Sequence, residues 1–409
     1  MGIGGSPLCS PFRGSLLTSQ YPHNCVSGHD QALPENARTI AHAFSEAGYQ
    51  TRYFGKWHVD GRENRTENTK PSHHHVRRER RGGFDTWIGY ENNNAQYDCW
   101  VHGHDRAGDE VSPFKLDGYE TDALTNLLID DLKNRDPDQP FFSVLAFQPP
   151  HSPYVAPQEF LDRYDPDSIQ LSPNVPPVDR VVSESRESLA GYYAMIENLD
   201  WNIGRIQESL ELLGLSESTA LIYFSDHGDM HGSHGRILKC VPFEESIRIP
   251  FVVDAKLRVT GTEQTAQCKQ QDPSLINHVD IGPTSLGICG IEKPDGMVGF
   301  DYSGSYVDDR EITETQPDSA FLQLVDPGFD HGFATDRERP WRGVVTSDGW
   351  KYAAFEGVPW LMYNLNEDPY EMANLAMDRR FKVERDRLQD RLGQWISETR
   401  DVFELPDVR

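Results

Sequence analysis

The chain has 409 residues, a formal net charge of −26 and 37% apolar residues. This length allows one large α/β domain with a smaller appendage, and the strong negative charge argues against a nucleic-acid partner. No apolar run reaches the roughly 18 residues that span a bilayer, so no membrane span is expected. The six cysteines show no metal-knuckle spacing and are too few for a disulfide scaffold of this size.

Helical and extended patterns alternate along most of the chain. They predict a short helix over 39–47, strands over 50–54, 141–147, 221–224 and 249–253, and a long helix from about 187 to 213. Such alternation indicates a largely parallel sheet covered by helices on both faces. The polar segment 62–83 is rich in Arg and His, and we expect it to be an exposed loop.

The pattern changes after about residue 316. Residues 343–355 alternate like an antiparallel strand pair, and residues 379–398 have the pattern of a closing helix. We therefore divide the chain into a catalytic domain over 1–315 and a small α+β subdomain over 316–409.

Cys9 opens the first segment that carries chemistry. Ser10 and Pro11 are a good N-cap and first-turn pair, so Cys9 is expected just ahead of a helix N-terminus. Free N–H groups and the helix dipole favour an anion there, and Arg13 adds a positive charge in the first turn. On these residues alone, a buried structural cysteine beside an ordinary helix cap is an equally good interpretation.

Three further polar segments each follow a predicted strand. Lys56 and His58 follow the strand at 50–54, and His151 follows the strand at 141–147. Asp226 and His227 follow the strand at 221–224. Open α/β sheets bind ligands at the carboxyl ends of their strands, and an imidazole can act as a base near neutrality. Each segment alone is also compatible with a solvated loop.

The four segments together resemble a known family. Cys-x-Pro-x-Arg followed by Leu-Leu-Thr at 9–18 resembles the signature of the type I, formylglycine-dependent sulfatases of the alkaline phosphatase superfamily. Gly-Lys-Trp-His at 55–58, His-x-Pro-Tyr at 151–154 and the stretch from 224 to Lys239 are similar to the family's other site segments, in the same order. Residues 278–291 and 363–375 also resemble the family, whereas Ser19-Gln20 stands where the family usually shows Gly-Arg.

The resemblance implies a fold and a reaction. The fold is an alkaline-phosphatase-like α/β/α sandwich with a large, mostly parallel central sheet, and the reaction is hydrolysis of a sulfate monoester. A formylglycine-generating enzyme would oxidise Cys9, and the hydrated aldehyde would attack sulfur. The remaining catalytic roles fall to five residues: Arg13, Lys56 and Lys239 bind sulfate, His151 acts as the acid and His58 as the base.

The resemblance also implies a divalent cation, most often calcium, held by Asp226 and His227. Family members carry two more Asp ligands on a central strand upstream of the formylglycine. Only eight residues precede Cys9, and none is acidic. We therefore expect that the N-terminal central strand is missing and that the native protein begins further upstream. No signal peptide opens this chain, so its location stays open, with the cytoplasm as the default.

The segment 92–104 is dense in amide, aromatic and imidazole groups. Such groups suit sugar hydroxyls and ring faces, which makes a sulfated carbohydrate or oligosaccharide the expected substrate. For any single residue here, an ordinary polar insertion is the plainer interpretation. The candidate substrate-binding residues are Asn94, Tyr97, Asp98, Trp100, His102 and His104.

Two other functions remain open at this point. The first is a phosphodiester or phosphonate monoester hydrolase, because relatives in the superfamily use the same formylglycine. The second is an inactive binding homologue that has lost its cation. Assays of sulfate and phosphate esters side by side would separate the two hydrolases, and metal analysis would identify the inactive homologue.

Overall fold

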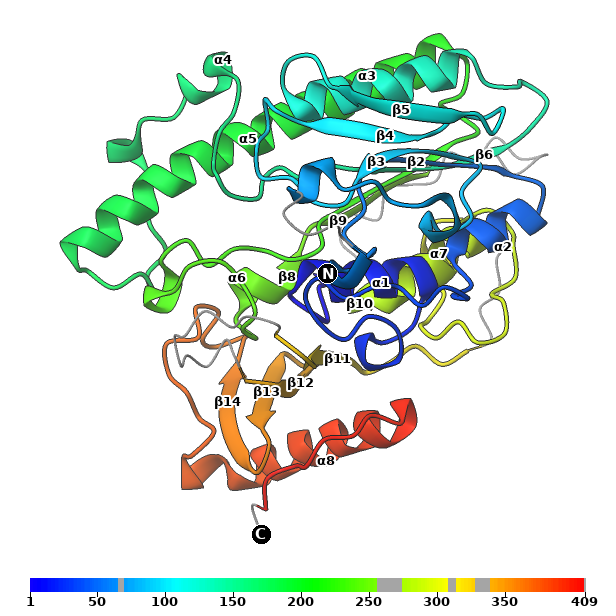
Figure 1. The fold of residues 1–409 in the computed structure, drawn as a ribbon. Helices are drawn as coiled ribbons and strands as arrows, with labels where there is room; N and C mark the ends of the chain where they lie inside the picture. The colour runs from blue at the N-terminus through cyan, green and yellow to red at the C-terminus, as the bar shows by residue number, and fades with distance from the viewer. Residues whose placement is uncertain (65–69, 256–273, 308–313, 328–338, 408–409) are drawn as a thin grey trace.

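We describe the protein from a computed structural model, in which residues 1–64, 70–255, 274–307, 314–327 and 339–407 are described. Its largest sheet has five strands in the order β5-β4-β3-β2-β6. Helices α3 and α5 cover one face of this sheet, and α1, α2 and α7 lie on the other (Figure 1). The strands are β2 (Gln50–Lys56), β3 (Thr86–Tyr90), β4 (Trp100–His104), β5 (Glu110–Lys115) and β6 (Phe141–Ala146). The helices are α1 (Cys9–Thr18), α2 (Ile40–Glu46), α3 (Glu120–Lys133), α5 (Asp179–Leu212) and α7 (Ile281–Ile288).

Strand β2 lies between the two layers of helices, and apolar side chains cover both of its faces. Tyr53 packs with Trp57 and Trp87 on the side of α1 and α2. Phe54 packs with Leu124 of α3 on the opposite side. Successive side chains of a strand point to opposite faces, so this strand is stable only when both faces are covered.

Three neighbouring strands of the sheet, β3, β2 and β6, are parallel, as the sequence predicts. Strand β2 pairs in parallel with β3 and with β6, so the carboxyl ends of these three strands meet at one edge. Strands β4 and β5 extend the sheet on the β3 side as antiparallel additions. Part of the predicted polar insertion at 92–104 therefore belongs to the sheet itself.

Other strands form separate ladders. Strand β7 (Ala220–Phe224) pairs with β9 (Phe251–Ala255), and β1 (Gly2–Ile3) lies between β8 (Arg248–Ile249) and β10 (Ile276–Asn277). The predicted strand over 249–253 is split at Pro250, because proline cannot donate to a ladder. Among the described residues, β6 pairs only with β2 and β7 only with β9, and every residue of β6 and β7 is partly buried.

Helix α5 begins at Asp179, earlier than the predicted start near residue 187. Its first turns are polar and partly exposed, so the apolar periodicity that located the rest of the helix is absent there. The helix has 34 residues. None of the helices in the described part of the chain is both long and apolar enough to cross a membrane.

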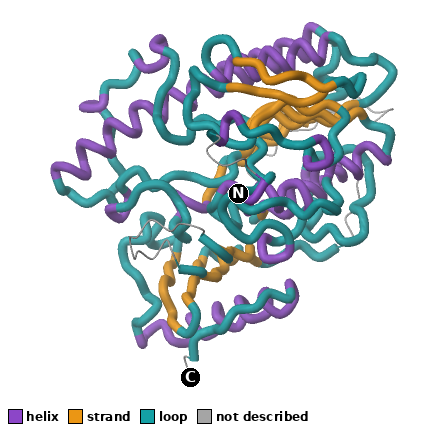
Figure 2. Tube along the Cα trace, viewed as in Figure 1, coloured by secondary structure: helices purple, strands orange, loops and turns teal. Residues whose placement is uncertain are grey.

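The C-terminal part is a four-stranded antiparallel sheet with a helix packed on it (Figure 2). Tyr352 from the sheet contacts Leu388 and Leu392 from the helix in one buried cluster. A second cluster joins Leu8 to Leu322, so this part also packs against the segment that precedes Cys9. The elements are β11 (Ser319–Leu324), β12 (Trp341–Thr346), β13 (Trp350–Phe355), β14 (Val358–Asn364) and α8 (Lys382–Thr399). The division of the chain between 315 and 316 stays a prediction.

Gly55 in β2 provides a test of this backbone path. Its φ is +104°, and a Cβ there would lie 2.1 Å from the carbonyl oxygen of Ala146. We expect Gly55→Ala to lower the free energy of unfolding by roughly 2 kcal/mol or more, because strained φ and a backbone clash act together. Denaturant unfolding would measure this change.

Gly204 in α5 is the matched control, because a Cβ there would meet no other part of the protein within 4 Å. We expect Gly204→Ala to raise the free energy of unfolding by roughly 0.5–1 kcal/mol, since alanine favours a helix. Similar effects of the two substitutions would contradict the described path of β2.

Candidate active site

Cys9 is the first residue of α1 and is 2% exposed. The sequence analysis expected Ser10 to cap this helix, and that detail is wrong, because Leu8 is the N-cap. The Ser10 hydroxyl instead accepts a hydrogen bond from the Asp30 N–H at 3.2 Å. Residue 9 still lies at the helix end where free N–H groups and the dipole favour negative charge.

The thiol of Cys9 faces the residues that follow β7. Its Sγ lies 3.1 Å from Nε2 of His227. The other ring nitrogen of His227 lies 2.9 Å from the Gly228 carbonyl oxygen and donates to it. An Asp226 carboxylate oxygen lies 3.7 Å from the same Nε2. The structure therefore brings the first and fourth predicted segments together.

Three cationic side chains come from separate elements to this point. Arg13 of α1 donates to the Lys56 carbonyl at 2.8 Å and lies 3.6 Å from the Asp226 carboxylate. Lys56 ends β2, and Lys239 comes from the loop after β7; they are 2% and 6% exposed. All three carry charge in a place that water scarcely reaches.

These charges act on Cys9. Burial raises the pKa of its thiol, but the positive charges of Lys239, Lys56 and His227 outweigh burial and hold the pKa well below its ordinary value. At Cys99, by contrast, burial dominates and raises the pKa of the thiol. The surroundings of residue 9 therefore stabilise an anion, whereas those of Cys99 do not.

His151 contacts the same group of cations. The Lys239 ammonium donates to Nε2 of His151 at 2.9 Å, and Nδ1 donates to the Ser152 carbonyl at 2.7 Å. Burial, with the charges of Lys239 and Lys56, lowers the pKa of His151 to about 3. The ring is therefore neutral in the ligand-free protein, and its Nε2 accepts the hydrogen bond from Lys239.

His58 lies two residues beyond β2, with φ of +60°. Its Nε2 lies 2.9 Å from an Asp30 carboxylate oxygen, while its buried Nδ1 has no hydrogen-bond partner in the part of the chain that the structure describes. The ring of His29 meets His58 edge-on, with centroids 5.1 Å apart. The sequence analysis did not single out His29 or Asp30, because no local pattern marks them.

Asp229 connects the third and fourth predicted segments. Its carboxylate accepts a hydrogen bond from the Tyr154 hydroxyl at 2.8 Å and another from the Leu238 N–H at 2.9 Å. It thereby ties the His151 segment to the loop that carries Lys239.

Some candidate substrate-binding residues lie beside the His151 segment. Asn94 accepts a hydrogen bond from the Gln148 side chain at 3.1 Å, and Tyr97 is 47% exposed. Asp98 forms an ion pair with a lysine of β5 and accepts a hydrogen bond from the Trp100 indole at 3.3 Å. These four residues remain accessible to a substrate.

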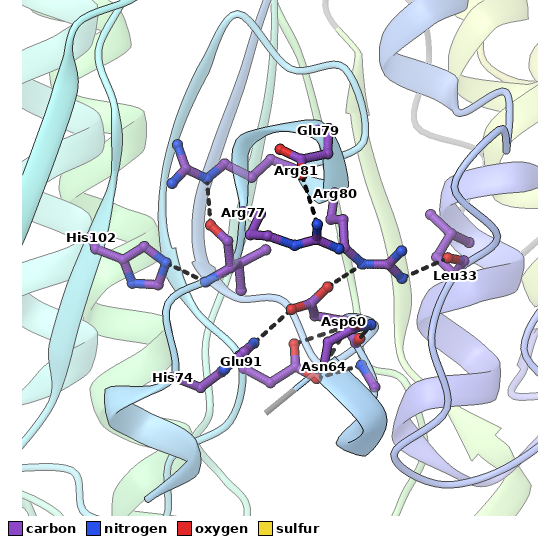
Figure 3. A network of polar contacts seen from close by, with 12 residues as sticks. Leu33, Asp60, Asn64, His74, Arg77, Glu79, Arg80, Arg81, Glu91 and His102 are labelled. Carbon is purple, nitrogen blue, oxygen red and sulfur yellow. Dashed lines mark hydrogen bonds and ion pairs between the residues drawn. The ribbon is translucent and has the colours of Figure 1, made fainter. Parts of the chain in front are cut away.

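His102 and His104 are used inside the fold. His102 accepts a hydrogen bond from the Val76 N–H at 2.9 Å (Figure 3). The two ring nitrogens of His104 contact the Phe84 carbonyl at 3.0 Å and Arg81 at 2.9 Å. Both rings are buried, so we remove them from the proposed substrate-binding set.

Most described residues of the Arg- and His-rich segment at 62–83 are exposed, as its composition predicts, but His74, Arg80 and Arg81 are buried and paired. His74 lies 2.6 Å from one carboxylate oxygen of Asp60, and Arg80 pairs with the other (Figure 3). Arg81 donates to both oxygens of Glu110 at 3.1 Å. Burial of these charges is tolerated because each is paired and hydrogen-bonded. Residues 65–69 lie outside the described residues.

One group of side chains at the site has the composition of a cation site. Cys9, Asp226 and His227 offer ligand atoms that all lie within 4.8 Å of one another. A carboxylate oxygen and an imidazole nitrogen fit part of the coordination shell of a divalent cation.

Comparisons with known proteins agree with this site. The profile of the family described as "Sulfatase" matches residues 2–291, and that of "N-sulphoglucosamine sulphohydrolase, C-terminal" matches residues 232–398. An ulvan-active sulfatase of Formosa agariphila is 32% identical over 426 aligned residues, which cover 99% of this chain and 75% of that protein.

Solved structures confirm the alkaline-phosphatase-like α/β fold. One, from work on glycosaminoglycan metabolism by Bacteroides thetaiotaomicron, is 28% identical, with a TM-score of 0.80 over 98% of this chain and 86% of that chain. A phosphonate monoester hydrolase of Agrobacterium radiobacter is 20% identical, with a TM-score of 0.76 over 97% and 88%. The second likeness shows the fold alone.

The effect of the nearby positive charges on residue 9 can be tested in the protein that still carries the Cys9 thiol. We expect the Cys9 thiol to ionise at a lower pH than Cys25 or Cys99, whose pKa values burial raises. The ultraviolet absorbance of the thiolate measures this, with Cys9→Ser as the blank. Lys239→Met should raise the Cys9 pKa, because it removes the strongest of the charges that lower it.

Lys133→Met is the control for this titration. Lys133 is an exposed lysine of α3 that pairs with Asp130 at 3.1 Å, so its loss should leave the Cys9 titration unchanged. If Lys239→Met also leaves it unchanged, the charge of Lys239 does not stabilise an anion at residue 9.

Proposed function

Because the chain belongs to the sulfatase family, we propose that its nucleophile is residue 9, in the form of a formylglycine made from Cys9. This chain is a sulfatase, an enzyme that hydrolyses sulfuric esters. The observation that carries the assignment is the convergence of cationic and imidazole side chains on one buried residue at a helix N-terminus. The proposed catalytic residues are Cys9, Arg13, Lys56, His58, His151 and Lys239.

Hydrated formylglycine supplies an oxygen nucleophile, which takes the sulfuryl group from the ester and releases it as sulfate when the aldehyde re-forms. Its formation requires a formylglycine-generating enzyme as a partner. The described surroundings of residue 9 suit an oxygen anion there, because the same charges that lower the pKa of the Cys9 thiol would stabilise it.

Lys56, Lys239 and Arg13 are the proposed sulfate-binding residues. The sulfate group of an ester is anionic, and negative charge builds on the ester oxygen as the bond to sulfur breaks. Fixed positive charges in a water-poor site stabilise that change more than they would in water. Lys239 already lies 2.9 Å from His151, which places the proposed acid next to one of these charges.

His151 is the proposed acid for the leaving oxygen. In the ligand-free protein its Nε2 accepts from Lys239, so the ring has no second proton to give. A bound sulfate offers Lys239 another acceptor, and its negative charge raises the pKa of His151. The ring can then take up a proton and pass it to the departing alcohol oxygen. His58 is the proposed base that removes a proton from residue 9.

We propose Ca²⁺ as the cation, with Asp226 and His227 among its ligands. Asp226 offers the hard oxygen that Ca²⁺ prefers, and the two side chains lie within 4.8 Å of Cys9. A bound cation would supply positive charge that orients the residue-9 oxygen and a sulfate oxygen. The inactive-homologue alternative predicts that no cation binds at these residues.

A sulfated carbohydrate is the proposed substrate class. Asn94 and Tyr97 lie beside the His151 segment, with Asp98 and Trp100 next to them. Two similar proteins are described as an ulvan-active sulfatase and as part of glycosaminoglycan metabolism. Exposed aromatic and polar groups beside the His151 segment suit a sugar ring.

The nucleophile assignment has a direct chemical test. In a host that contains the modifying enzyme, the residue-9 peptide should carry an aldehyde, detected by mass and by capture on a hydrazide resin. Cys9→Ala should abolish both the capture and the hydrolysis of sulfate esters. An active protein from such a host that holds only the free Cys9 thiol would rule out the formylglycine mechanism.

The role of His151 predicts a dependence on the leaving group. His151→Ala should slow hydrolysis of a sugar sulfate by on the order of 10²-fold or more, because its alkoxide needs a proton. Hydrolysis of para-nitrophenyl sulfate should fall far less, since nitrophenolate leaves without one. Equal losses on both substrates would contradict the assignment of His151 as the acid. A faster reaction with the para-nitrophenyl phosphonate monoester would favour the alternative hydrolase.

A further inference from the structure

We propose that Asp30 is a positioning residue for His58, which it orients so that Nδ1 is the atom that takes the proton from residue 9. This inference rests on the proposed function and names a residue that the four sequence segments do not contain. Asp30 lies in the stretch between α1 and α2, far from β2 in the chain. Three sets of contacts support the assignment.

The first set of contacts indicates which nitrogen of the neutral His58 ring carries the hydrogen. Its Nε2 lies 2.9 Å from Asp30 Oδ1. An ionised carboxylate only accepts hydrogen bonds, so Nε2 carries the hydrogen and the lone pair of the neutral ring is on Nδ1. The residue is 1% exposed, and its buried Nδ1 has no hydrogen-bond partner among the described residues. A buried unpaired acceptor is costly unless it serves a purpose, and a base needs such an atom.

The second set fixes Asp30 relative to the nucleophile. Its N–H donates to the Ser10 hydroxyl at 3.2 Å, and its carbonyl accepts from the Arg62 N–H at 2.7 Å. Ser10 is the neighbour of residue 9, so one short chain of contacts joins the helix of the nucleophile to the ring of His58. The φ of Asp30 is +55°, a conformation that Asp and Asn tolerate better than most residues.

The third set concerns charge. His29 meets His58 edge-on, and its Nε2 lies 3.7 Å from Asp30 Oδ1, beyond hydrogen-bond distance. Burial, and after it the charge of His58, lowers the pKa of His29 to about 4. His29 is therefore neutral near pH 7, so it adds no second positive charge beside His58 and Asp30.

The contacts define one step of the reaction. Residue 9 carries a hydroxyl and a sulfate on the same carbon after the ester has been cleaved. His58 Nδ1 takes the hydroxyl proton, the O–H electrons form the aldehyde C=O bond, and the carbon–oxygen bond to sulfate breaks with its electrons on sulfate. The ring is then an imidazolium, which the Asp30 carboxylate stabilises, as in Ser-His-Asp triads. Water later accepts the proton, and another water hydrates the aldehyde.

Asp30→Asn is the test, because asparagine keeps the shape and tolerates positive φ but removes the charge. In the metal-loaded, formylglycine-containing enzyme, steady-state turnover of para-nitrophenyl sulfate should fall by on the order of 10²-fold. The first turnover should still release nitrophenol as a burst. Mass analysis of the quenched enzyme should find sulfate retained on the residue-9 peptide, which a merely structural defect would not produce.

Two other variants make the result decisive. Asp326→Asn is the matched control, because it removes the charge of an aspartate that accepts a hydrogen bond at 2.9 Å from Gln31, the neighbour of Asp30 in the chain; it should keep steady turnover without retained sulfate. His58→Ala should retain sulfate. Retention in His58→Ala but not in Asp30→Asn would overturn this inference and leave the proposed function intact. Retention in neither would overturn the base role of His58 itself.

The tautomer gives a second measurement that needs no turnover. Nitrogen NMR of labelled histidines in the unmodified protein, with the signal assigned through His58→Gln, should show a hydrogen on Nε2 of His58. A hydrogen on Nδ1 would overturn the inference, because the proposed base atom would then have no lone pair to offer.

Discussion

The positive charge gathered around residue 9 is the constraint on which the rest of the site depends. Lys56 and Lys239 are nearly buried beside a residue that is itself 2% exposed. Burial disfavours a charged lysine, and it lowers the pKa of Lys56 for that reason. The two ammonium groups are stable there only when an anion faces them. In a chain of net charge −26, this local field selects a sulfate ester over neutral molecules.

The fold keeps these charges in place because each one lies on a helix, on a strand or in a loop that is held by hydrogen bonds. Residue 9 and Arg13 share a helix, and Lys56 ends the central strand β2. Asp229 fastens the loop of Lys239 to the segment of His151 through Tyr154. Sites built on helices and strands hold their geometry better than sites on free loops. Such fixed charges need little rearrangement when the ester bond breaks.

The sequence predicted the residues that follow strands and missed those that depend on tertiary contact. Lys56, His151 and Asp226 could be found because a buried strand followed by polar residues marks the ligand edge of a parallel sheet. Asp30 has no such mark: it lies in an irregular stretch and gains its role only because the chain brings it to His58. The sequence likewise does not show whether a polar residue has a hydrogen-bond or ion-pair partner in the fold.

The same limit explains the interpretations that failed. His102 and His104 look like surface groups in the sequence, yet they accept hydrogen bonds inside the sheet region. Ser10 and Pro11 resemble a helix start, but the Ser10 hydroxyl accepts a hydrogen bond from Asp30 and the helix begins two residues earlier, at Cys9. Local patterns indicate what a residue can do, and the neighbours supplied by the fold decide which of these roles it takes.

The affinity of the enzyme for its product, inorganic sulfate, tests the central claim most directly. Isothermal titration would compare the unsubstituted protein with Lys56→Met, Lys239→Met and the double variant, with Lys133→Met as the exposed control. The account predicts that each site substitution weakens sulfate binding by at least about tenfold, the factor that corresponds to about 1.4 kcal/mol of lost charge interaction. It also predicts that added neutral salt weakens binding in the unsubstituted protein more than in the double variant. Sulfate that binds the double variant as tightly as the unsubstituted protein would contradict the claim that these buried charges create the site.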